Sequence, residues 1–309
     1  MLPEQDTIEW LDARRECIGG SDAGVIMGIT PKKWGTKYKT YLEKLGVGAR
    51  RVTTEAMKRG KALEPMARQA FIVKSGINMT PKMVWSQTHY FMFASLDGLS
   101  DCGKFILETK APGRDDHAEA KAGRVPAKYK AQLQHYLAVG GYECCYYVSY
   151  AIKEGVTPQI SEAYPYGKPE DFEIVTVIVK PDEVFQERLI EEEGSFWKNH
   201  VEKFIPPEME KEDYEQKEGD EWEGLVSKYL LLDKEIKDKT KEKEEARELI
   251  IGLCGSSNSR GAGVKVMRVA QPGRIDYTKI EALKGIDLER YRKDPIEYWQ
   301  ITKEKSEVK

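Results

Sequence analysis

Residues 93–112 read FASLDGLSDCGKFILETKAP, a short β-rich run that carries two carboxylates and a lysine. Asp97 is followed eleven residues later by Glu108, and Lys110 comes two residues after that. Side chains alternate faces along a strand, so Glu108 and Lys110 are expected on one side of a sheet, about 7 Å apart along the chain. The turn residues are Gly98, Ser100, Asp101 and Gly103. They would fold the segment into a hairpin, bring Asp97 beside Glu108, and so create a place where Mg²⁺ could bind.

Three further stretches accompany this segment along the chain. WLDARRECIGGSDAG (10–24) and RGKALEPMARQAF (59–71) lie upstream, and YKAQLQHYLAVGG (129–141) lies downstream. Together the four stretches resemble the lambda-type exonuclease, or YqaJ-like viral recombinase, family of the PD-(D/E)xK nuclease superfamily. The resemblance spans about residues 8–205, roughly two thirds of the chain. The chain departs from the PD-(D/E)xK pattern at one position. Leu96 precedes Asp97, whereas the pattern has proline before this aspartate.

Apolar periodicity predicts an α/β domain with a central mixed sheet flanked by helices, and the resemblance makes this a restriction-endonuclease-like PD-(D/E)xK core. The predicted helices cover residues 36–45, 53–73, 126–140 and 182–204, and the predicted strands cover 78–85, 91–96, 104–109, 143–152 and 172–179. Pro206 and Pro207 would end the last helix, because a continuing helix would not tolerate them. We therefore expect the exonuclease domain to occupy residues 1–205.

Residues 206–309 are expected to form an acidic C-terminal extension. Residues 208–224 are acidic and predicted to be loose, and residues 222–254 predict a helix of about thirty residues with apolar ends and a charged middle. A flexible link over 255–263, a β-hairpin over 264–277 and short helices would follow. An acidic segment is not attracted to the phosphates of DNA. We therefore expect it to contact protein, either a neighbouring subunit or a partner.

Charge is divided unevenly between the two halves of the chain. Residues 1–150 carry 22 Lys and Arg against 16 Asp and Glu, whereas residues 151–309 carry 27 against 36. The halves therefore have net charges of +6 and −9, which together give the overall −3. The basic half contains the candidate catalytic residues. This is expected when one domain binds the phosphates of DNA and the other does not.

The composition disfavours several other classes of protein. Five irregularly spaced cysteines without a C-x-x-C pair argue against a disulfide framework and an iron–sulfur cluster. The four histidines have no zinc-site spacing, and neither a P-loop nor a G-x-S-x-G motif occurs. No apolar run approaches the ~20 residues of a membrane span, and the opening residues lack signal-peptide features. We expect a cytoplasmic protein of a bacterium or a phage-infected cell.

Phosphodiester cleavage needs a nucleophilic hydroxide and a Lewis acid, and divalent metals supply both. Asp97 and Glu108 are the expected ligands of Mg²⁺, for which Mn²⁺ would substitute, with the backbone carbonyl of Thr109 as a third ligand. Lys110 would hold or deprotonate the attacking water, or it simply pairs with Glu108. The resemblance adds Glu64, because the family takes one carboxylate from the helix before the sheet; the alternative is a solvated helix glutamate.

The downstream stretch places polar side chains on one helix face. Tyr129, Gln132 and Tyr136 fall at i, i+3 and i+7. The resemblance matches Gln132 and Tyr136 to the family's Q-x-x-x-Y pattern. It implies that Gln132 positions the water or a metal ligand and that Tyr129 contacts the DNA backbone, while Tyr136 is mainly structural.

The resemblance also assigns residues to the end of the DNA. Trp10, Arg14 and Ser21 match a signature that holds the terminal 5′-phosphate, and a guanidinium offers a planar fork for phosphate oxygens. Ser95 occupies a matching place in the quoted strand. Met57 falls where relatives place an apolar residue that splits the duplex end. Each of these has a plainer alternative as a surface or packing residue.

The resemblance implies a Mg²⁺-dependent 5′→3′ exonuclease on double-stranded DNA. Such an enzyme releases 5′-mononucleotides and leaves 3′ single strands for phage-type recombination by annealing. A ring-shaped trimer and a single-strand annealing protein as partner are implied as well. Two alternatives remain open: an endonuclease of the same fold, and a non-catalytic DNA-recombination adaptor whose acidic half recruits partners.

Overall fold

A computed structural model of the protein describes residues 14–47, 53–271, 273, 279–283 and 286. The chain divides into two compact units, Met1–Tyr214 and Glu215–Lys309. Trp10, part of the predicted phosphate signature, lies outside the described residues.

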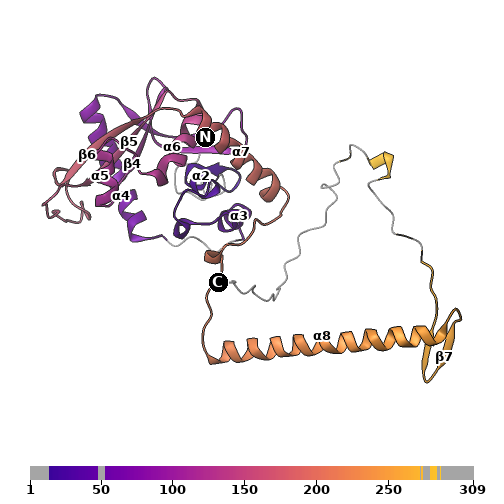
Figure 1. Ribbon diagram of the computed structural model, residues 1–309. Helices are drawn as coiled ribbons and strands as arrows, with labels where there is room; N and C mark the ends of the chain where they lie inside the picture. Colours follow the sequence, from indigo (N-terminus) through magenta and orange to yellow (C-terminus); the bar gives the residue numbers. More distant parts are fainter. Residues whose placement is uncertain (1–13, 48–52, 272, 274–278, 284–285, 287–309) are drawn as a thin grey trace. The chain divides into compact units, whose positions relative to one another are not determined.

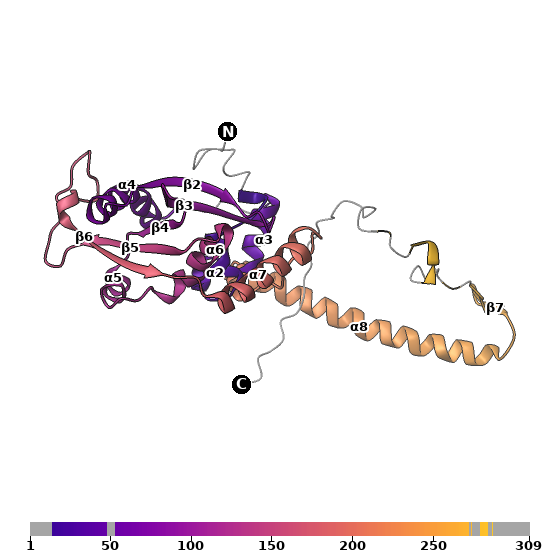
Figure 2. The same ribbon diagram turned by 90° about the horizontal axis from the view of Figure 1, so that it is seen from above.

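A mixed sheet forms the centre of the first unit (Figures 1 and 2). Its strands are β1 (Ile18–Gly19), β2 (Met79–Trp85), β3 (Met92–Ser100), β4 (Phe105–Lys110), β5 (Cys144–Ile152) and β6 (Phe172–Val179). β4 and β5 are parallel, as are β1 and β3, and the other pairs are antiparallel. β2 pairs along one edge of β3, while β1 and β4 share the opposite edge, because Phe93 pairs with both β2 and β1 and Leu99 with both β2 and β4.

Helices cover both faces of the sheet. They are α2 (Gly20–Ile26), α3 (Lys37–Leu45), α4 (Glu55–Ser75), α5 (Arg114–Lys121), α6 (Lys130–Gly140) and α7 (Glu183–Phe196). Alternation along β4 separates two apolar clusters: Ile106 packs with α2, α6 and α7, whereas Leu107 packs with α4. The predicted α/β class, with a central mixed sheet flanked by helices, is confirmed.

Local sequence signals explain where the predicted helices begin and end. The side chains of Thr36 and Thr54 cap α3 and α4 by accepting a hydrogen bond from the backbone N–H three residues on. Gly46 and Gly76 end these helices in the left-handed conformation, with φ of 70° and 71°, which glycine adopts without steric cost. Helices α2 and α5 were not predicted; both are short, with seven and eight residues.

The hairpin between β3 and β4 turns later than predicted. Gly98 and Ser100 lie within β3, and the turn comprises residues 101–104. The Ser100 carbonyl accepts from the Gly103 N–H at 2.8 Å, and its hydroxyl accepts from the Phe105 N–H at 3.0 Å. These bonds close the turn, so the part of the prediction that placed Gly98 and Ser100 in it was wrong.

The first unit extends past the predicted boundary at residue 205. Pro206 and Pro207 follow the helical segment as expected, but Pro207 is buried and the chain stays on the unit as far as Tyr214. The Thr36 hydroxyl donates to Asp213, whose side chain is fully buried, and Lys32 forms an ion pair with Glu210. Residues 206–214 are acidic and carry no local pattern that predicts these contacts. The contacts depend on residues far away in the sequence, so they could not be predicted from it.

A chain that ends at Tyr214 is therefore expected to be more stable than one that ends at Ile205. The shorter chain loses the hydrogen bond between Thr36 and Asp213, worth about 1 kcal/mol. Circular dichroism melts should show a difference in Tm of about 2–4 °C or more. Equal melting temperatures would mean that residues 206–214 do not belong to the folded unit.

The second unit consists mainly of one long helix. α8 (Asp220–Cys254) has 35 residues, close to the predicted length. A hairpin of β7 (Ser259–Gly261) and β8 (Val264–Val266) follows, so the hairpin begins five residues earlier than predicted. A short 3₁₀ turn covers Glu281–Leu283; most of the predicted terminal helices lie outside the described residues. No helix in the described part of the chain has the length and apolar character of a membrane span.

Candidate active site

A cleft of about 1280 Å³ opens in the first unit, between β3, β4 and the helices α2, α4 and α6. It brings together the described residues that the sequence assigned to a site. These are Arg14, Ser21, Met57, Glu64, Ser95, Asp97, Glu108, Thr109, Lys110, Tyr129 and Gln132.

Strand divergence creates the cleft. β3 pairs with β4 through Gly98↔Leu107 and Leu99↔Ile106, and with β1 only at Met92 and Phe93. In the part of the chain that the structure describes, the middle of this edge of β3 therefore has no neighbouring strand. Asp97 and Glu108 lie at the start of this opening, one step beyond the last β3–β4 pair, where their side chains can meet a ligand.

A β-bulge in β3 aims the first carboxylate. β3 advances three residues from Leu96 to Leu99 while β2 advances two, so one extra residue is inserted around Asp97. The neighbouring Gly98 is required by space: a Cβ there would lie 2.8 Å from the Cβ of Met79 and 3.1 Å from that of Leu107. Its role is thus close packing in a strand, where the sequence suggested a turn.

Asp97 is held by its neighbour on β4. Its Oδ2 accepts hydrogen bonds from the backbone N–H of Thr109 at 2.7 Å and from the Thr109 hydroxyl at 2.8 Å. Arg68 of α4 donates to the Asp97 carbonyl at 2.8 Å. Burial raises the pKa of Asp97, against the lowering effects of Lys110 and Thr109. Two bonds to one oxygen fix the orientation of this carboxylate.

Glu108 is buried, with 2% of its surface exposed. Its Oε1 accepts from Lys110 Nζ at 2.5 Å and from Gln132 Nε2 at 2.8 Å. Its Oε2 is buried and has no hydrogen-bond partner among the described residues. Burial and then the Asp97 carboxylate raise the pKa of Glu108 to about 8, with Lys110 opposing them. Such an oxygen, next to a second carboxylate, is a place that a cation would fill.

Lys110, Gln132 and Tyr129 surround this carboxylate. Burial alone would lower the pKa of Lys110, but the charges of Glu108 and Asp97 outweigh it and raise that pKa. Lys110 Nζ also lies 5.3 Å from the ring centroid of Tyr129. Gln132 Nε2 donates to the Tyr136 hydroxyl at 3.1 Å as well as to Glu108, so the helix face predicted from sequence points at the second carboxylate.

Glu64 lines the cleft from α4. Its Oε1 accepts from Arg68 Nη1 at 2.9 Å, one helical turn away. Burial and then the nearby Asp97 charge raise the pKa of Glu64. The sequence did not point to Arg68, which links Glu64 to the backbone of Asp97; only its i+4 spacing from Glu64 could have suggested the pair.

The donor set fits a hard divalent cation. Mg²⁺ takes oxygen ligands and keeps several waters, so it needs few protein ligands. Within the described residues no three His, Cys, Asp or Glu side chains come together as a metal cluster. A bound ion would therefore be held by Asp97 and the free Oε2 of Glu108, with the Thr109 carbonyl, Glu64 or water completing the shell.

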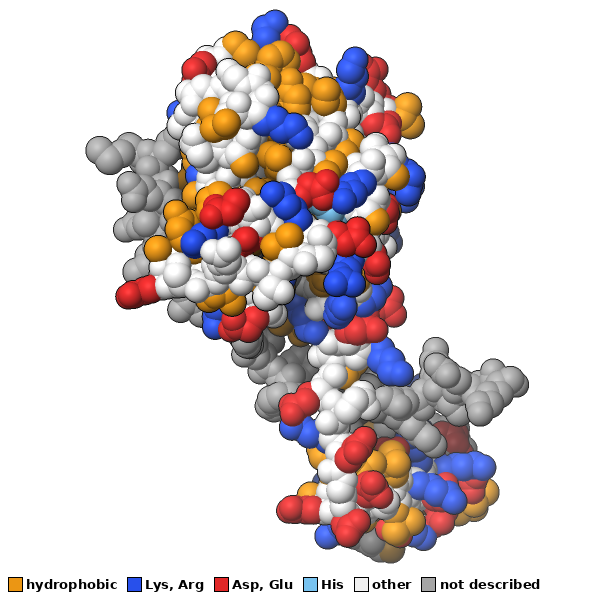
Figure 3. All heavy atoms as spheres, turned by 90° about the vertical axis from the view of Figure 1, so that its left-hand side faces the viewer, with side chains coloured by type: hydrophobic (Ala, Val, Ile, Leu, Met, Phe, Trp, Pro, Cys, Tyr) orange, Lys and Arg blue, Asp and Glu red, His pale blue; other side chains and the backbone are white. Residues whose placement is uncertain are grey.

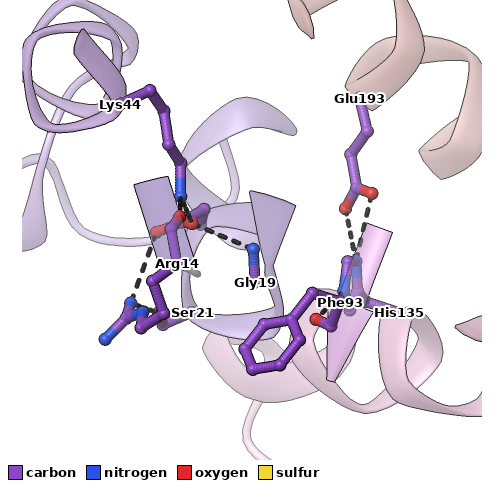
Figure 4. A network of polar contacts seen from close by, with 8 residues as sticks. Arg14, Gly19, Ser21, Lys44, Phe93, His135 and Glu193 are labelled. Atoms are coloured by element: carbon purple, nitrogen blue, oxygen red, sulfur yellow. Dashed lines mark hydrogen bonds and ion pairs between the residues drawn. The ribbon is translucent and has the colours of Figure 1, made fainter. Parts of the chain in front are cut away.

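A second polar network holds Arg14, which also lines the cleft (Figure 4). Arg14 Nη2 donates to the Ser21 hydroxyl at 3.0 Å, and its guanidinium lies 3.9 Å from the carboxylate of Asp22. The buried Lys44 donates from Nζ to Asp22 at 2.6 Å and to the Arg14 carbonyl at 2.8 Å. Sequence reasoning missed Asp22 and Lys44, because a buried ion pair between two helices leaves no local pattern.

Replacement of Lys44 by Ala should destabilise the fold strongly. Burial would raise the pKa of Asp22, but the charges of Lys44 and Arg14 lower it to about 2. Loss of Lys44 leaves the buried Asp22 carboxylate with only the more distant Arg14 charge and the Gly19 N–H, and breaking a buried ion pair costs about 3–5 kcal/mol. Chemical denaturation measures the change in the free energy of unfolding. Lys37→Ala is the control, because Lys37 also forms an ion pair, at 3.6 Å from Glu192, but both side chains of that pair are partly exposed. Similar losses in both variants would show that the Asp22–Lys44 pair has no special role.

A third network ties α6 and α7 to the central strand. His135 lies between Glu193, whose carboxylate it contacts at 2.8 and 3.0 Å, and the carbonyl of Phe93, at 2.9 Å (Figure 4). All three residues are buried. Burial opposes the charged form of His135, but the Glu193 charge prevails and raises its pKa. This network fixes the helix that carries Gln132.

The remaining predicted residues line the cleft without a strong fixed contact. Met57 lies in the first turn of α4 with 47% of its surface exposed, and Ser95 is half-buried in β3. Basic side chains outnumber acidic ones in the lining: Arg14, Lys33, Lys58, Lys61, Lys110 and Lys128 against Glu64, Asp97 and Glu108. On the face of the molecule drawn in Figure 3, by contrast, both signs are interspersed.

The first unit shares its fold with a solved exonuclease, and a family model matches part of the chain. Residues 9–143 match the YqaJ-like viral recombinase domain, which confirms the family resemblance predicted from the motifs. The chain is 34% identical over 143 residues to the uncharacterized protein YqaJ of Bacillus subtilis (strain 168). That match covers 45% of this chain and 44% of YqaJ, so it spans less than half the length of the relative.

The solved structures that resemble the chain include an alkaline exonuclease. The enzyme from Laribacter hongkongensis is 23% identical, with a TM-score of 0.52, and the match covers 64% of this chain and 94% of that enzyme. Its complex with dAMP matches with 22% identity, the same TM-score and the same coverage. At this identity the likeness establishes the fold.

Proposed function

We propose that the protein is a metal-dependent nuclease that degrades double-stranded DNA from its ends in the 5′→3′ direction, releasing 5′-mononucleotides and leaving 3′ single strands. The observation that carries this proposal is the meeting of Asp97, Glu108, Lys110 and Gln132 in one cleft, with Glu108 Oε2 buried and unpaired. The fold shared with an alkaline exonuclease supports it.

The chain's own residues would divide the work as follows. When bound, Mg²⁺ or Mn²⁺ supplies Lewis acidity for the phosphate oxygens and lowers the pKa of water. Asp97, oriented by Thr109, and Glu108, oriented by Gln132, would hold the cation through their carboxylate oxygens. Lys110 donates hydrogen bonds from Nζ, which suits it to hold the attacking water and to stabilise negative charge on the phosphate. The excess of basic groups lining the cleft attracts the DNA backbone.

Arg14 is the proposed contact for a terminal 5′-phosphate. Its guanidinium is oriented by Ser21 and Asp22 and lines the same cleft as the two carboxylates. A planar guanidinium can bind two phosphate oxygens at once, which favours a dianionic end over a hydroxyl end. This contact would set the polarity of digestion, since it marks the 5′ end.

Arg14→Ala should slow digestion of 5′-phosphorylated duplexes far more than that of 5′-hydroxyl duplexes. Hydrogen bonds to charged groups contribute about 1.5–3 kcal/mol, so the preference for phosphorylated ends should fall by roughly 10- to 100-fold. Initial rates on the two substrates measure this, with the exposed Arg124→Ala as control. Equal losses on both substrates would make Arg14 a structural residue or a general phosphate contact.

The competing functions predict different substrates and partners. An endonuclease would cut covalently closed circular DNA, which has no end for Arg14 to bind, and an adaptor would cut neither circular nor linear DNA. Lys110 and Gln132 both donate to Glu108, and Asp97 lines the same cleft, so the central polar residues are all present, which argues against an adaptor. We further propose a single-strand annealing protein as partner, from the resemblance, and a cytoplasmic location, from the composition.

A further inference from the structure

Helix α8 carries a seven-residue repeat that the proposed nuclease chemistry does not use. Trp222, Tyr229, Ile236 and Ile250 fall on one position of the repeat, and Leu225, Leu232, Ala246 and Leu253 fall three residues later on another. In the notation abcdefg, these are positions a and d. The only polar residues on the two positions are Lys243 (a) and Lys239 (d), both in the middle of the helix. Apolar residues at a and d over five repeats are typical of a coiled coil.

The repeat forms an exposed seam. No residue of α8 is buried among the described residues. The large apolar side chains at a and d are between 44% and 89% exposed: Trp222, Leu225, Tyr229, Leu232, Ile236, Ile250 and Leu253. Figure 1 shows α8 as one continuous helix. An exposed apolar stripe of this kind, interrupted by Lys239 and Lys243, marks an interface.

We propose that α8 pairs with α8 of a second copy of this chain, in parallel and in register, as a coiled coil. The position of the two lysines favours this alignment. In register, Lys239 and Lys243 meet their own counterparts in two adjacent layers, and every other layer is apolar on both sides. An antiparallel pair that overlays the apolar ends would set Lys243 against Leu232 and Lys239 against Ile236, so four layers would each bury a charge among apolar atoms.

Charges beside the seam favour the same alignment. In a parallel pair, position g of one helix lies near position e of the next repeat on the other. This places Lys228 beside Asp233 of the second copy and Glu242 beside Arg247, two attractive contacts. The antiparallel alignment would instead set Glu235 against Glu242, a repulsive contact.

Ion pairs within one α8 do not prevent these contacts between two copies. Asp233 accepts from Lys237 at 2.8 Å and Glu248 from Arg247 at 2.8 Å, but these side chains are exposed and such pairs contribute little. Isoleucine occupies position a at Ile236 and Ile250, and leucine occupies position d at Leu225, Leu232 and Leu253, a combination that favours two strands. The seam would therefore join two copies through helices about 52 Å long.

Cysteine pairing in the full-length chain tests the alignment. Leu232→Cys places a thiol at position d, where two in-register parallel helices bring it against its counterpart. Leu231→Cys, one residue earlier at position c, is the matched control on the outside of the seam, and the unaltered chain measures pairing by the native cysteines. Under mild oxidation, Leu232→Cys should give a covalent dimer on a non-reducing gel, at least tenfold more than the control.

Sedimentation equilibrium of the full-length chain supplies an independent measurement. Leu232→Asp should weaken self-association at least tenfold relative to Leu231→Asp, while circular dichroism shows the helix retained. Equal disulfide yields at positions 231 and 232 would overturn the parallel, in-register pair. A chain that stays monomeric at all concentrations would overturn the pairing itself and indicate that another segment or another protein covers the seam.

Discussion

Asp97→Asn and Glu108→Gln are each expected to abolish DNA degradation in Mg²⁺, with a fall in rate of at least ~10³. Each change keeps the shape of the side chain and removes the negative charge that would hold the cation. The loss of a metal's Lewis acidity is worth several kcal/mol, and each 1.36 kcal/mol corresponds to a factor of ten in rate. Release of acid-soluble nucleotides from a linear duplex measures the effect.

Stability separates loss of chemistry from loss of fold in these variants. The folded-state pKa of Glu108, about 8, lies above its ordinary value, so without metal its ionisation costs folding free energy as the pH rises from about 4.5 to 8. Glu108→Gln removes this cost, and metal-free protein should melt at the same or a higher temperature at pH 8. Glu143→Gln, an exposed carboxylate outside the cleft, is the control and should behave as the parent. Parent-like rates for Asp97→Asn would show that the site is misassigned.

Lys110→Ala should reduce turnover by about 10²–10⁴ while DNA binding is retained. The ammonium group lies 2.5 Å from Glu108 and is one of several basic groups in the cleft, so its loss removes assistance to the reaction more than affinity for the backbone. Single-turnover rates and a DNA-binding titration, measured on the same protein, separate the two effects.

Lys104→Ala is the matched control for this lysine. Lys104 lies in the turn before β4, is exposed and pairs with Glu143, so its loss should leave both measurements unchanged. If Lys110→Ala instead weakened binding with an unchanged single-turnover rate, Lys110 would be a phosphate contact and not part of the reaction.

Patterns within one element were enough to predict most of the sheet and the long helices. Threonine caps and terminal glycines determine α3 and α4, and short runs of apolar, β-branched and aromatic residues identify β5 and β6. What failed depended on pairing between distant segments. Gly98 was read as a turn residue, but it packs against Met79 and Leu107 of the neighbouring strands. The bulge at Asp97 likewise exists only in relation to β2.

In the candidate site, too, residues within one element could be predicted and contacts between elements could not. Asp97, Glu108 and Lys110 could be selected by their spacing within a hairpin together with the family resemblance, and Gln132 by the family's Q-x-x-x-Y pattern on one helix face. Arg68, Asp22 and Lys44 could not, since each acts on a residue of another element: Arg68 on the Asp97 carbonyl, and Lys44 on Asp22 and Arg14. Orienting contacts of this kind become visible only after the chain is folded.

The most direct test is digestion of a linear 5′-phosphorylated duplex by the full-length protein with Mg²⁺, with EDTA, and with Mg²⁺ added back after EDTA. The site described here predicts nucleotide release in Mg²⁺, none in EDTA, and full recovery when Mg²⁺ is restored. Equal release in EDTA would contradict a site in which Asp97 and Glu108 hold a catalytic cation.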